Sequence, residues 1–173
     1  MNGFLLIIPF FLVRFGLLAK MDRRAVQRAA HFAPMQGGEV TAYWVYQICT
    51  AFLILYPLFV RITAGPPVLL CTGVALYIAG LALLAASIVH FSRPDGAGLN
   101  TGGVYRFSRN PMYVAYFLYF MGIAALARSA LLFCVVAVFQ FSAHWIILAE
   151  ERECRQLFGA SYEQYCKKVR RYF

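Results

Sequence analysis

Long apolar runs are the feature that most constrains this 173-residue chain. Hydrophobic residues make up 62% of it and charged residues only 13%, too few charges to cover the surface of a soluble domain. Five runs approach the length of a membrane-spanning helix. They lie near 4–19, 41–60, 68–91, 112–127 and 130–149. The sequence therefore predicts an all-α, polytopic membrane protein with five transmembrane helices.

The first and fourth runs are the shortest of the five. Sixteen residues of α-helix extend about 24 Å, whereas the hydrocarbon core of a bilayer is about 30 Å thick. We therefore expect flanking residues to lengthen these two helices, or the bilayer to thin around them. The ends of both helices cannot be placed from the length of the run alone.

The basic residues predict the orientation in the membrane. The chain carries 16 Lys and Arg and a net charge of +9, which in a soluble protein would suggest a nucleic-acid partner. With five spans, however, most of them fall on one face, in the segments 20–40, 92–111 and 150–173. Only Arg61 and Arg128 fall on the opposite face, and Arg14 lies inside the first run. The positive-inside rule then predicts an external N-terminus, a cytoplasmic tail and no nucleic-acid partner.

The chain has no long linker, so we expect a single membrane domain, 1–173. Its first part, 1–91, would supply three helices as a scaffold facing the substrate. Its second part, 92–173, would supply two helices with a loop and a tail that carry the chemistry. The tail is expected to be an amphipathic helix that stops near Gly159, with a second short helix from Ser161.

Metal binding is not indicated by the sequence. The five cysteines include no Cys-x-x-Cys pair, and no His-Glu-x-x-His motif is present, so neither a thiolate zinc site nor a helical histidine site is predicted. We expect no metal.

The segment 101–113, "TGGVYRFSRNPMY", interrupts the apolar pattern. Asn110 and Pro111 are typical of a helix start, as N-cap and first helical residue. That does not explain the preceding Tyr105 and Arg109, nor the glycines, which allow a ligand to approach the backbone closely. The helix that follows has an aromatic face, formed by Tyr113, Tyr116, Phe117 and Phe120.

The last apolar run carries polar residues along one face. Gln140, His144 and Glu151 fall within about 60° of one another around a helix. Polar groups in a span are costly unless they face protein or water, so we expect them to face the bundle interior or a cytoplasmic cavity. Two plainer interpretations stay open: a helix-bridging hydrogen bond for His144, and a solvated pair for Glu150 and Glu151.

The two unusual stretches together resemble a known family. The loop is followed about 40 residues later by "EERECRQLFGASYEQYCKKVRRY", and the pair is similar to the C-terminal half of the isoprenylcysteine carboxyl methyltransferase family and its phospholipid methyltransferase relatives. The matching positions are Gly103, Val104, Tyr105, Arg109, Pro111, Tyr113, Glu150, Glu151, Phe158, Gly159, Tyr162, Tyr165, Val169 and Arg171. Residues 1–90 match only in being hydrophobic. Where the family usually has His, this chain has Asn110, which puts a titratable role there in doubt.

The resemblance implies S-adenosylmethionine as the cofactor, bound in a cytoplasm-facing pocket. Taken together with the polar face of the last run, the candidate cofactor-binding residues are Gly102, Gly103, Val104, Tyr105, Arg109, Asn110, Pro111, Tyr113, His144, Glu150 and Glu151. The cationic sulfonium and amino groups would suit Glu150, Glu151 and the face of Tyr113, and the carboxylate would suit Arg109 or the glycine amides. Catalytic roles are implied for Arg109, Glu151 and Arg171, the last as a holder of an acceptor carboxylate.

The acceptor implied is a lipidic or amphipathic small molecule that enters from the bilayer, with carboxyl O-methylation favoured and N- or S-methylation open. No obligate protein partner is indicated. Two other classes stay open. Sterol reductases, which use NADPH, share a similar Arg-His-Pro-x-Tyr motif and tyrosine-rich tail but have about twice as many spans. A non-enzymatic membrane scaffold would bind neither cofactor and would co-purify with a partner.

Overall fold

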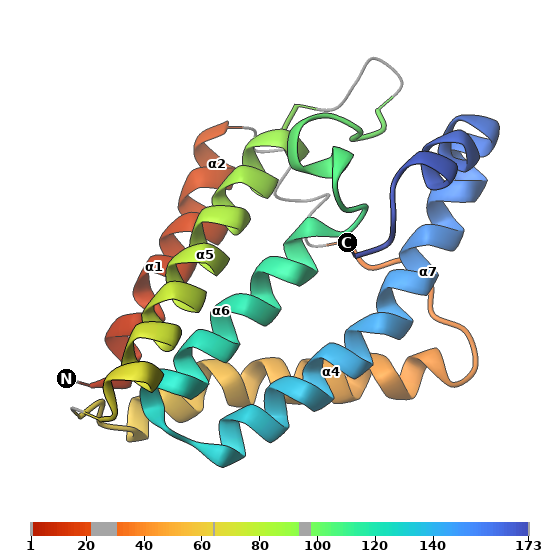
Figure 1. Ribbon diagram of the computed structural model, residues 1–173. Helices are drawn as coiled ribbons and strands as arrows, with labels where there is room; N and C mark the ends of the chain where they lie inside the picture. Colours follow the sequence, from red (N-terminus) through yellow and green to blue (C-terminus); the bar gives the residue numbers. More distant parts are fainter. Residues whose placement is uncertain (1, 22–30, 64, 94–97, 173) are drawn as a thin grey trace.

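The computed structural model describes residues 2–21, 31–63, 65–93 and 98–172. These residues form helices joined by loops (Figure 1). The prediction of an all-α fold is confirmed.

The chain begins with a continuous helical segment, Gly3–Met21, called here the first rod. It consists of η1 (Gly3–Leu6), α1 (Ile8–Phe11), the π-helix η2 (Leu12–Leu17) and α2 (Leu18–Met21). Its start is tied to the end of the second helix, because the amide of Gly3 donates to the carbonyl of Val60 at 2.8 Å.

The second and third predicted runs are helices with nearly the expected ends. The helix α4 (Glu39–Leu55) continues into the 3₁₀ turn η3 (Tyr56–Phe59), and α5 spans Pro67–Phe91. Proline is accepted in the first turn of α5 because the amide it lacks has no partner within the helix there.

The last two helices are α6 (Pro111–Ala127) and α7 (Ala130–Lys168). Between them Arg128 adopts a left-handed φ of 51°, and the side chain of Ser129 caps α7 by accepting from the amide of Leu132. The last apolar run and the first part of the predicted amphipathic tail form one helix, since α7 runs without interruption past Glu150 and Glu151. The part of α7 before Gly159, residues 130–158, extends about 44 Å, beyond a hydrocarbon core of about 30 Å. The helix breaks at Gly159 (φ 50°, ψ −127°), where the sequence predicts a stop.

Four helices in the described part of the chain are long and apolar enough to cross a membrane: Gly3–Met21, Glu39–Phe59, Pro67–Phe91 and Ala130–Lys168. The remaining predicted span, α6, has 17 residues and extends only about 26 Å. Most of its residues are buried, so it is the central helix of the bundle. The apolar helices make this an integral membrane protein, and the count of five spans stays a prediction.

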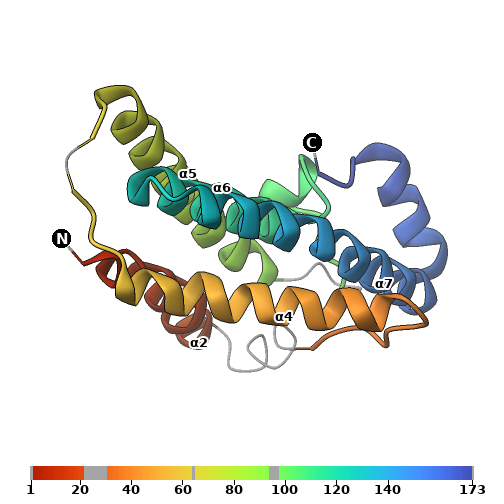
Figure 2. The same ribbon diagram turned by 90° about the horizontal axis from the view of Figure 1, so that it is seen from below.

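Glycines bring α5 and α6 into backbone contact. A Cβ on Gly80 would lie 2.5 Å from the amide nitrogen of Tyr119, and one on Gly122 would lie 2.5 Å from the amide nitrogen of Tyr77. The two helices run side by side in both views, with α7 packed against α4 (Figures 1 and 2). Small residues allow this approach between membrane helices.

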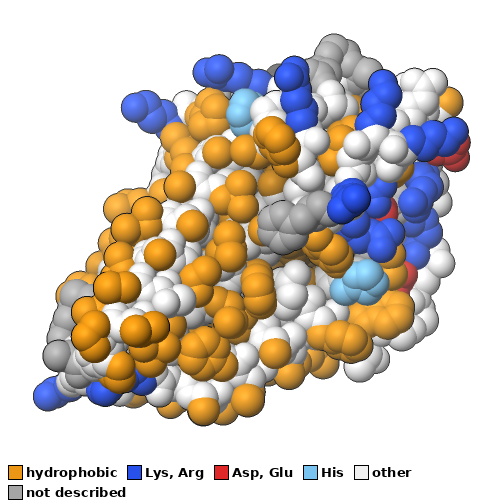
Figure 3. Space-filling view, in the orientation of Figure 1, with side chains coloured by type: hydrophobic (Ala, Val, Ile, Leu, Met, Phe, Trp, Pro, Cys, Tyr) orange, Lys and Arg blue, Asp and Glu red, His pale blue; other side chains and the backbone are white. Residues whose placement is uncertain are grey.

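The surface drawn in Figure 3 is divided by side-chain type. Hydrophobic side chains cover the middle of the face, over the first rod, α5 and α6, and most Lys and Arg gather toward the loop before α6 and the end of α7. An apolar belt with basic residues beyond it fits a bundle set in a bilayer.

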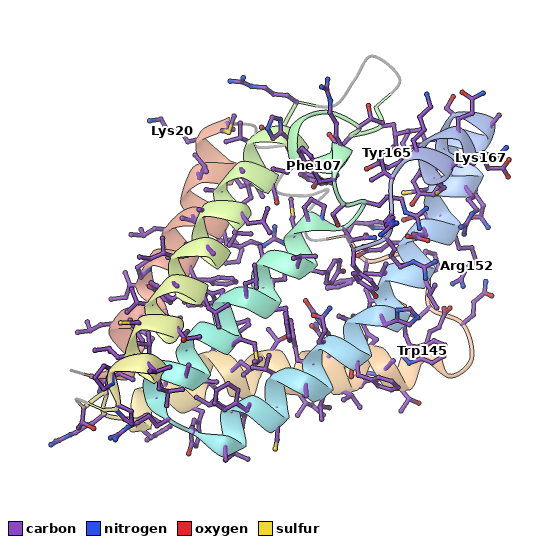
Figure 4. All side chains as sticks on the ribbon, viewed as in Figure 1. Lys20, Phe107, Trp145, Arg152, Tyr165 and Lys167 are labelled. Carbon is purple, nitrogen blue, oxygen red and sulfur yellow. The ribbon has the colours of Figure 1, made fainter. Side chains whose placement is uncertain are left out.

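The C-terminal segment after Lys168 folds back to the start of α6 (Figure 1). The amide of Arg109 donates to the carbonyl of Arg170 at 3.0 Å, and the hydroxyl of Tyr165 donates to the carbonyl of Tyr105 at 2.7 Å. Figure 4 places Tyr165 between the loop and the end of α7. The loop and the tail, more than fifty residues apart in the chain, are therefore one structural unit.

Candidate functional site

A cavity of about 570 Å³ lies between the first rod, α4, α6 and α7, within the usual range for small-ligand pockets. The predicted site residues that line it are Tyr105, Arg109, Asn110, Pro111, Tyr113, Glu150 and Glu151. Residues of 1–91 line it as well, among them Phe10, Arg14 and Tyr46. Both parts of the predicted domain thus contribute to one site.

Tyr113 and Glu150 form a polar pair on the cavity wall. Tyr113 comes from the first turn of α6, and its hydroxyl donates to Oε1 of Glu150 on α7 at 2.7 Å. The hydrogen bond orients the carboxylate, and the buried ring of Tyr113 lies beside it. An aromatic face with an adjacent carboxylate is a suitable environment for a cation.

Glu151 has different partners although it follows directly in the chain. Its side chain is 1% exposed, and it pairs with Arg109 at 3.0 Å and with Arg171 at 3.0 Å. Arg155 reaches the same carboxylate at 3.7 Å from one turn further along α7. Hydrogen bonds to Glu151 raise the pKa of Arg171, so this arginine stays charged. The cluster of Arg109, Glu151 and Arg171 is called here the arginine brace.

Asn110 completes the arginine brace instead of capping its helix. The helix α6 begins at Pro111 as predicted, but the Asn110 side chain makes no cap hydrogen bond. Its Nδ2 donates to the carbonyl of Arg171 at 3.2 Å and approaches Oε1 of Glu151 at 3.5 Å. Asn110 keeps the predicted N-cap position, but its side chain does not cap the helix, because the returning C-terminal segment supplies acceptors for this amide.

Two residues that line the cavity each have a buried polar atom without a hydrogen-bond partner in the described part of the chain. These atoms are Oδ1 of Asn100, an acceptor, and Nε of Arg109, a donor. Buried polar atoms are nearly always satisfied in native proteins. A ligand with both donors and acceptors would satisfy them, and S-adenosylmethionine, with its amino, hydroxyl and carboxylate groups, fits that requirement.

The residues 102–105 bring one side chain, that of Tyr105, to the cavity. Gly103 has a φ of +55° and is packed against the ring of His90, whereas a Cβ on Gly102 would meet no atom within 4 Å. Within η4 (Gly103–Arg106), the carbonyl of Val104 accepts from the amide of Phe107. Burial raises the pKa of Tyr105 well above its usual value, so its hydroxyl stays protonated. Of 102–105, Tyr105 lines the cavity and the other three do not.

His144 is placed away from the cavity. Its Nδ1 lies 2.7 Å from the hydroxyl of Tyr172, so it holds the C-terminal segment against α7. Gln140, predicted on the same face, does not line the cavity either. Glu151 alone of these three residues does, because it lies about 10 Å further along α7 than His144 on nearly the same face.

Several residues that line the cavity were not predicted as site residues from the sequence. Arg14, Tyr46, Asn100, Tyr162 and Tyr165 all border the cavity. Tyr162 and Tyr165 had a signal in the tail motif. Arg14 also had one, as a single cation in the middle of an apolar run, a position that is costly unless it serves a function. Tyr46 and Asn100 carry no local signal, because only the packing of α4 and the loop brings them there.

Comparison with known proteins agrees with the resemblance seen in the loop and tail. The chain is 36% identical over 106 residues to the protein-S-isoprenylcysteine O-methyltransferase of Schizosaccharomyces pombe, an alignment that covers 58% of this chain and 44% of that relative. No solved structure matches the chain. The profile of the phospholipid methyltransferase family matches residues 71–161, which include α6, the loop before it and the acidic pair on α7. Because this match spans more than half of the 173 residues, the chain belongs to the phospholipid methyltransferase family.

Proposed function

We propose that this protein is an S-adenosylmethionine-dependent methyltransferase that acts on a lipidic or amphipathic acceptor. The observation that carries the proposal is the Tyr113–Glu150 pair on the wall of a cavity of about 570 Å³. Membership of the phospholipid methyltransferase family supports it. Since the aligned relative is an O-methyltransferase, a carboxylate is the favoured acceptor group.

The residues of the cavity have distinct roles in this proposal. Glu150 and the ring of Tyr113 hold the cationic part of the cofactor, and Nε of Arg109 meets its carboxylate. Glu151 and Arg171 act as positioning residues, because the arginine brace holds Arg109 and the start of α6 in place. Asn100 offers its unpaired Oδ1 to a donor on the ligand.

The bound cofactor would supply an electrophilic methyl group carried on its sulfonium sulfur. This methyl group would pass to the acceptor as the carbon–sulfur bond breaks. A carboxylate acceptor already has the lone pair it needs, so no general base is required of the chain. The protein's contribution is alignment of the acceptor and exclusion of water. The apolar side chains around the cavity, including Phe120 and Phe139, suit that role.

The test is a calorimetric titration of purified protein in detergent with S-adenosylhomocysteine and S-adenosylmethionine. Glu150→Gln should weaken binding about tenfold or more, because a charged hydrogen-bonding partner is lost. Glu163→Gln removes an exposed charge from the same helix and should leave the affinity unchanged. Absence of binding by the wild-type protein would refute the proposal, and preferential binding of NADPH would favour a reductase.

We also propose that the loop, the tail and the polar end of the cavity are cytoplasmic and the N-terminus external. The basic residues of the tail, such as Lys167 and Lys168, support this orientation by the positive-inside rule. Labelling of single lysines by an impermeant reagent in sealed vesicles tests it. Modification of Lys167 from the external side would reverse the assignment.

A further inference from the structure

The proposed function assigns no role to Arg14, although this residue lines the cavity. Arg14 lies in the first rod, an apolar segment with a mean hydropathy of 2.0, about midway along it. A charged side chain at such a position is costly unless it faces a cavity or a partner within the protein. Arg14 does face the cavity, as one of its lining residues.

The surroundings of Arg14 within the cavity are largely aromatic. Its guanidinium carbon lies 5.9 Å from the ring centroid of Tyr116, and Nη1 lies 3.8 Å from the sulfur of Met112. Phe10 and Phe11 line the same part of the cavity. In low-polarity surroundings an arginine binds an anion far more strongly than in water, and its planar fork matches a carboxylate or phosphate.

The backbone at Arg14 is itself unusual. Residues Leu12–Leu17 form a π-helix, with α-helix on both sides. Such segments are rare and occur frequently at functional sites, where the added residue changes the direction of side chains. The adjacent Gly16 cannot explain it by packing, since a Cβ there would meet nothing within 4 Å.

The cavity carries opposite charges on two walls. Glu150 lies on α7 and Arg14 on the first rod, and the two interact electrostatically. A cationic ligand group is therefore favoured at Glu150 and an anionic group at Arg14.

The cavity also reaches the apolar outside of the bundle beside Arg14. Phe15 lines the cavity and is nevertheless 53% exposed. On the facing helix α4, Thr50 and Ile54 line it as well. An apolar chain can thus extend from Arg14 along the first rod and α4 toward the hydrocarbon.

We propose that Arg14 binds the anionic group, a carboxylate or a phosphate, of the amphipathic methyl acceptor, whose apolar chain lies between the first rod and α4. The description of this ligand as a methyl acceptor rests on the proposed methyltransferase function. Recognition of an anionic amphiphile by Arg14 can be measured without turnover. Arg14 thereby becomes the residue that selects charged over neutral amphiphiles.

The experiment measures binding of two matched pairs of probes to detergent-purified protein. One pair is N-acetyl-S-farnesylcysteine and its methyl ester, and the other is oleoyl lysophosphatidic acid and monooleoylglycerol. The wild-type protein should prefer the charged member of one pair by about tenfold or more. The pair that shows the preference identifies the anion as a carboxylate or a phosphate.

Arg14→Gln should bring the two members of that pair within about threefold of each other, by lowering affinity for the anion only. Arg14→Lys keeps the charge and should retain part of the preference. Lys20→Gln is the matched control, because Lys20 is exposed at the C-terminal end of the same rod (Figure 4) and does not line the cavity. Thermal unfolding of each variant shows whether the bundle is intact.

An unchanged preference in Arg14→Gln, or no preference in the wild-type protein, would overturn the proposal. Equal loss of S-adenosylhomocysteine affinity in Arg14→Gln would also overturn it, by assigning Arg14 to the cofactor. If Arg14→Gln does not fold, Arg14→Lys is the deciding variant. A stronger preference for the anionic probe in Arg14→Lys than in the wild-type protein would contradict recognition of the anion by the planar guanidinium. Failure of the wild-type protein to bind S-adenosylhomocysteine refutes the methyltransferase function separately and leaves the anion preference measurable.

Discussion

Arg171 closes a two-point ion pair on Glu151: its Nε lies 3.1 Å from Oε1 and its Nη2 lies 3.0 Å from Oε2. Arg109 approaches Oε1 from the opposite side at 3.0 Å. One buried carboxylate thus joins α7, the start of α6 and the C-terminal segment. The arrangement explains why acidic and basic residues from three separate stretches meet in a largely apolar bundle.

The charge of Glu151 should be essential for folding stability. Glu151→Gln keeps the side-chain shape but leaves Arg109, with 10% of its side chain exposed, without its counter-charge. Breaking such a pair should lower the free energy of unfolding by about 3 kcal/mol. Arg171→Gln should cost less, because Arg171 is 30% exposed and Arg109 still neutralises the carboxylate. Chemical unfolding in detergent micelles, followed by fluorescence, measures both, and a Glu151→Gln protein as stable as wild type would contradict the arginine brace.

The two adjacent glycines of the loop should respond differently to alanine. Gly103→Ala places a Cβ on a residue with φ +55° and against the ring of His90, and should destabilise the protein by about 2 kcal/mol. Gly102→Ala meets open space and should shift stability by less than about 0.5 kcal/mol. Melting temperatures of the two variants provide the comparison. Equal melting temperatures would mean that the loop does not pack on α5 as described.

The contact between α5 and α6 should tolerate no added methyl group. Gly80→Ala forces a Cβ to within 2.5 Å of the Tyr119 amide nitrogen, and overpacking of this kind costs about 1–3 kcal/mol. Gly16→Ala is the control in another apolar helix, since its Cβ would have no neighbour within 4 Å. We expect Gly80→Ala to lower the melting temperature and Gly16→Ala to leave it nearly unchanged. The reverse order would show that another surface of α5 packs on α6.

Docking of the tail should depend on one hydroxyl. Tyr165→Phe removes the donor to the buried carbonyl of Tyr105, and an unsatisfied buried acceptor costs about 1–2 kcal/mol. Because the tail is one side of the unit, we expect the amides of the loop and the tail to exchange faster with deuterium. Exchange measured by mass spectrometry on the intact protein checks this. Faster exchange spread evenly over α5 and α6 would indicate global unfolding and contradict local docking.

Helix positions follow largely from local features that the sequence displays. The apolar run near 41–60 corresponds to α4 with η3, and the run near 68–91 corresponds to α5. Both could be predicted because the length of an apolar run and the helix start at Pro67 are properties of the segment itself. Gly159 likewise marks a break in α7, as glycine alone readily adopts its combination of φ 50° and ψ −127°. The residues of the loop and the tail, and the spacing between them, were also enough to connect the chain with the phospholipid methyltransferase family.

The partners of the polar side chains depend on contacts between segments far apart in the chain. Asn110 has the local features of an N-cap, but the carbonyl of Arg171 draws its amide away. Glu150 and Glu151 are neighbours in sequence, yet helical rotation turns one toward Tyr113 and the other toward Arg171. Arg14 reaches the same cavity from the opposite end of the chain. Periodicity along one helix predicts which residues share a face, and the approach of other helices then selects the charge or hydroxyl that each of them meets.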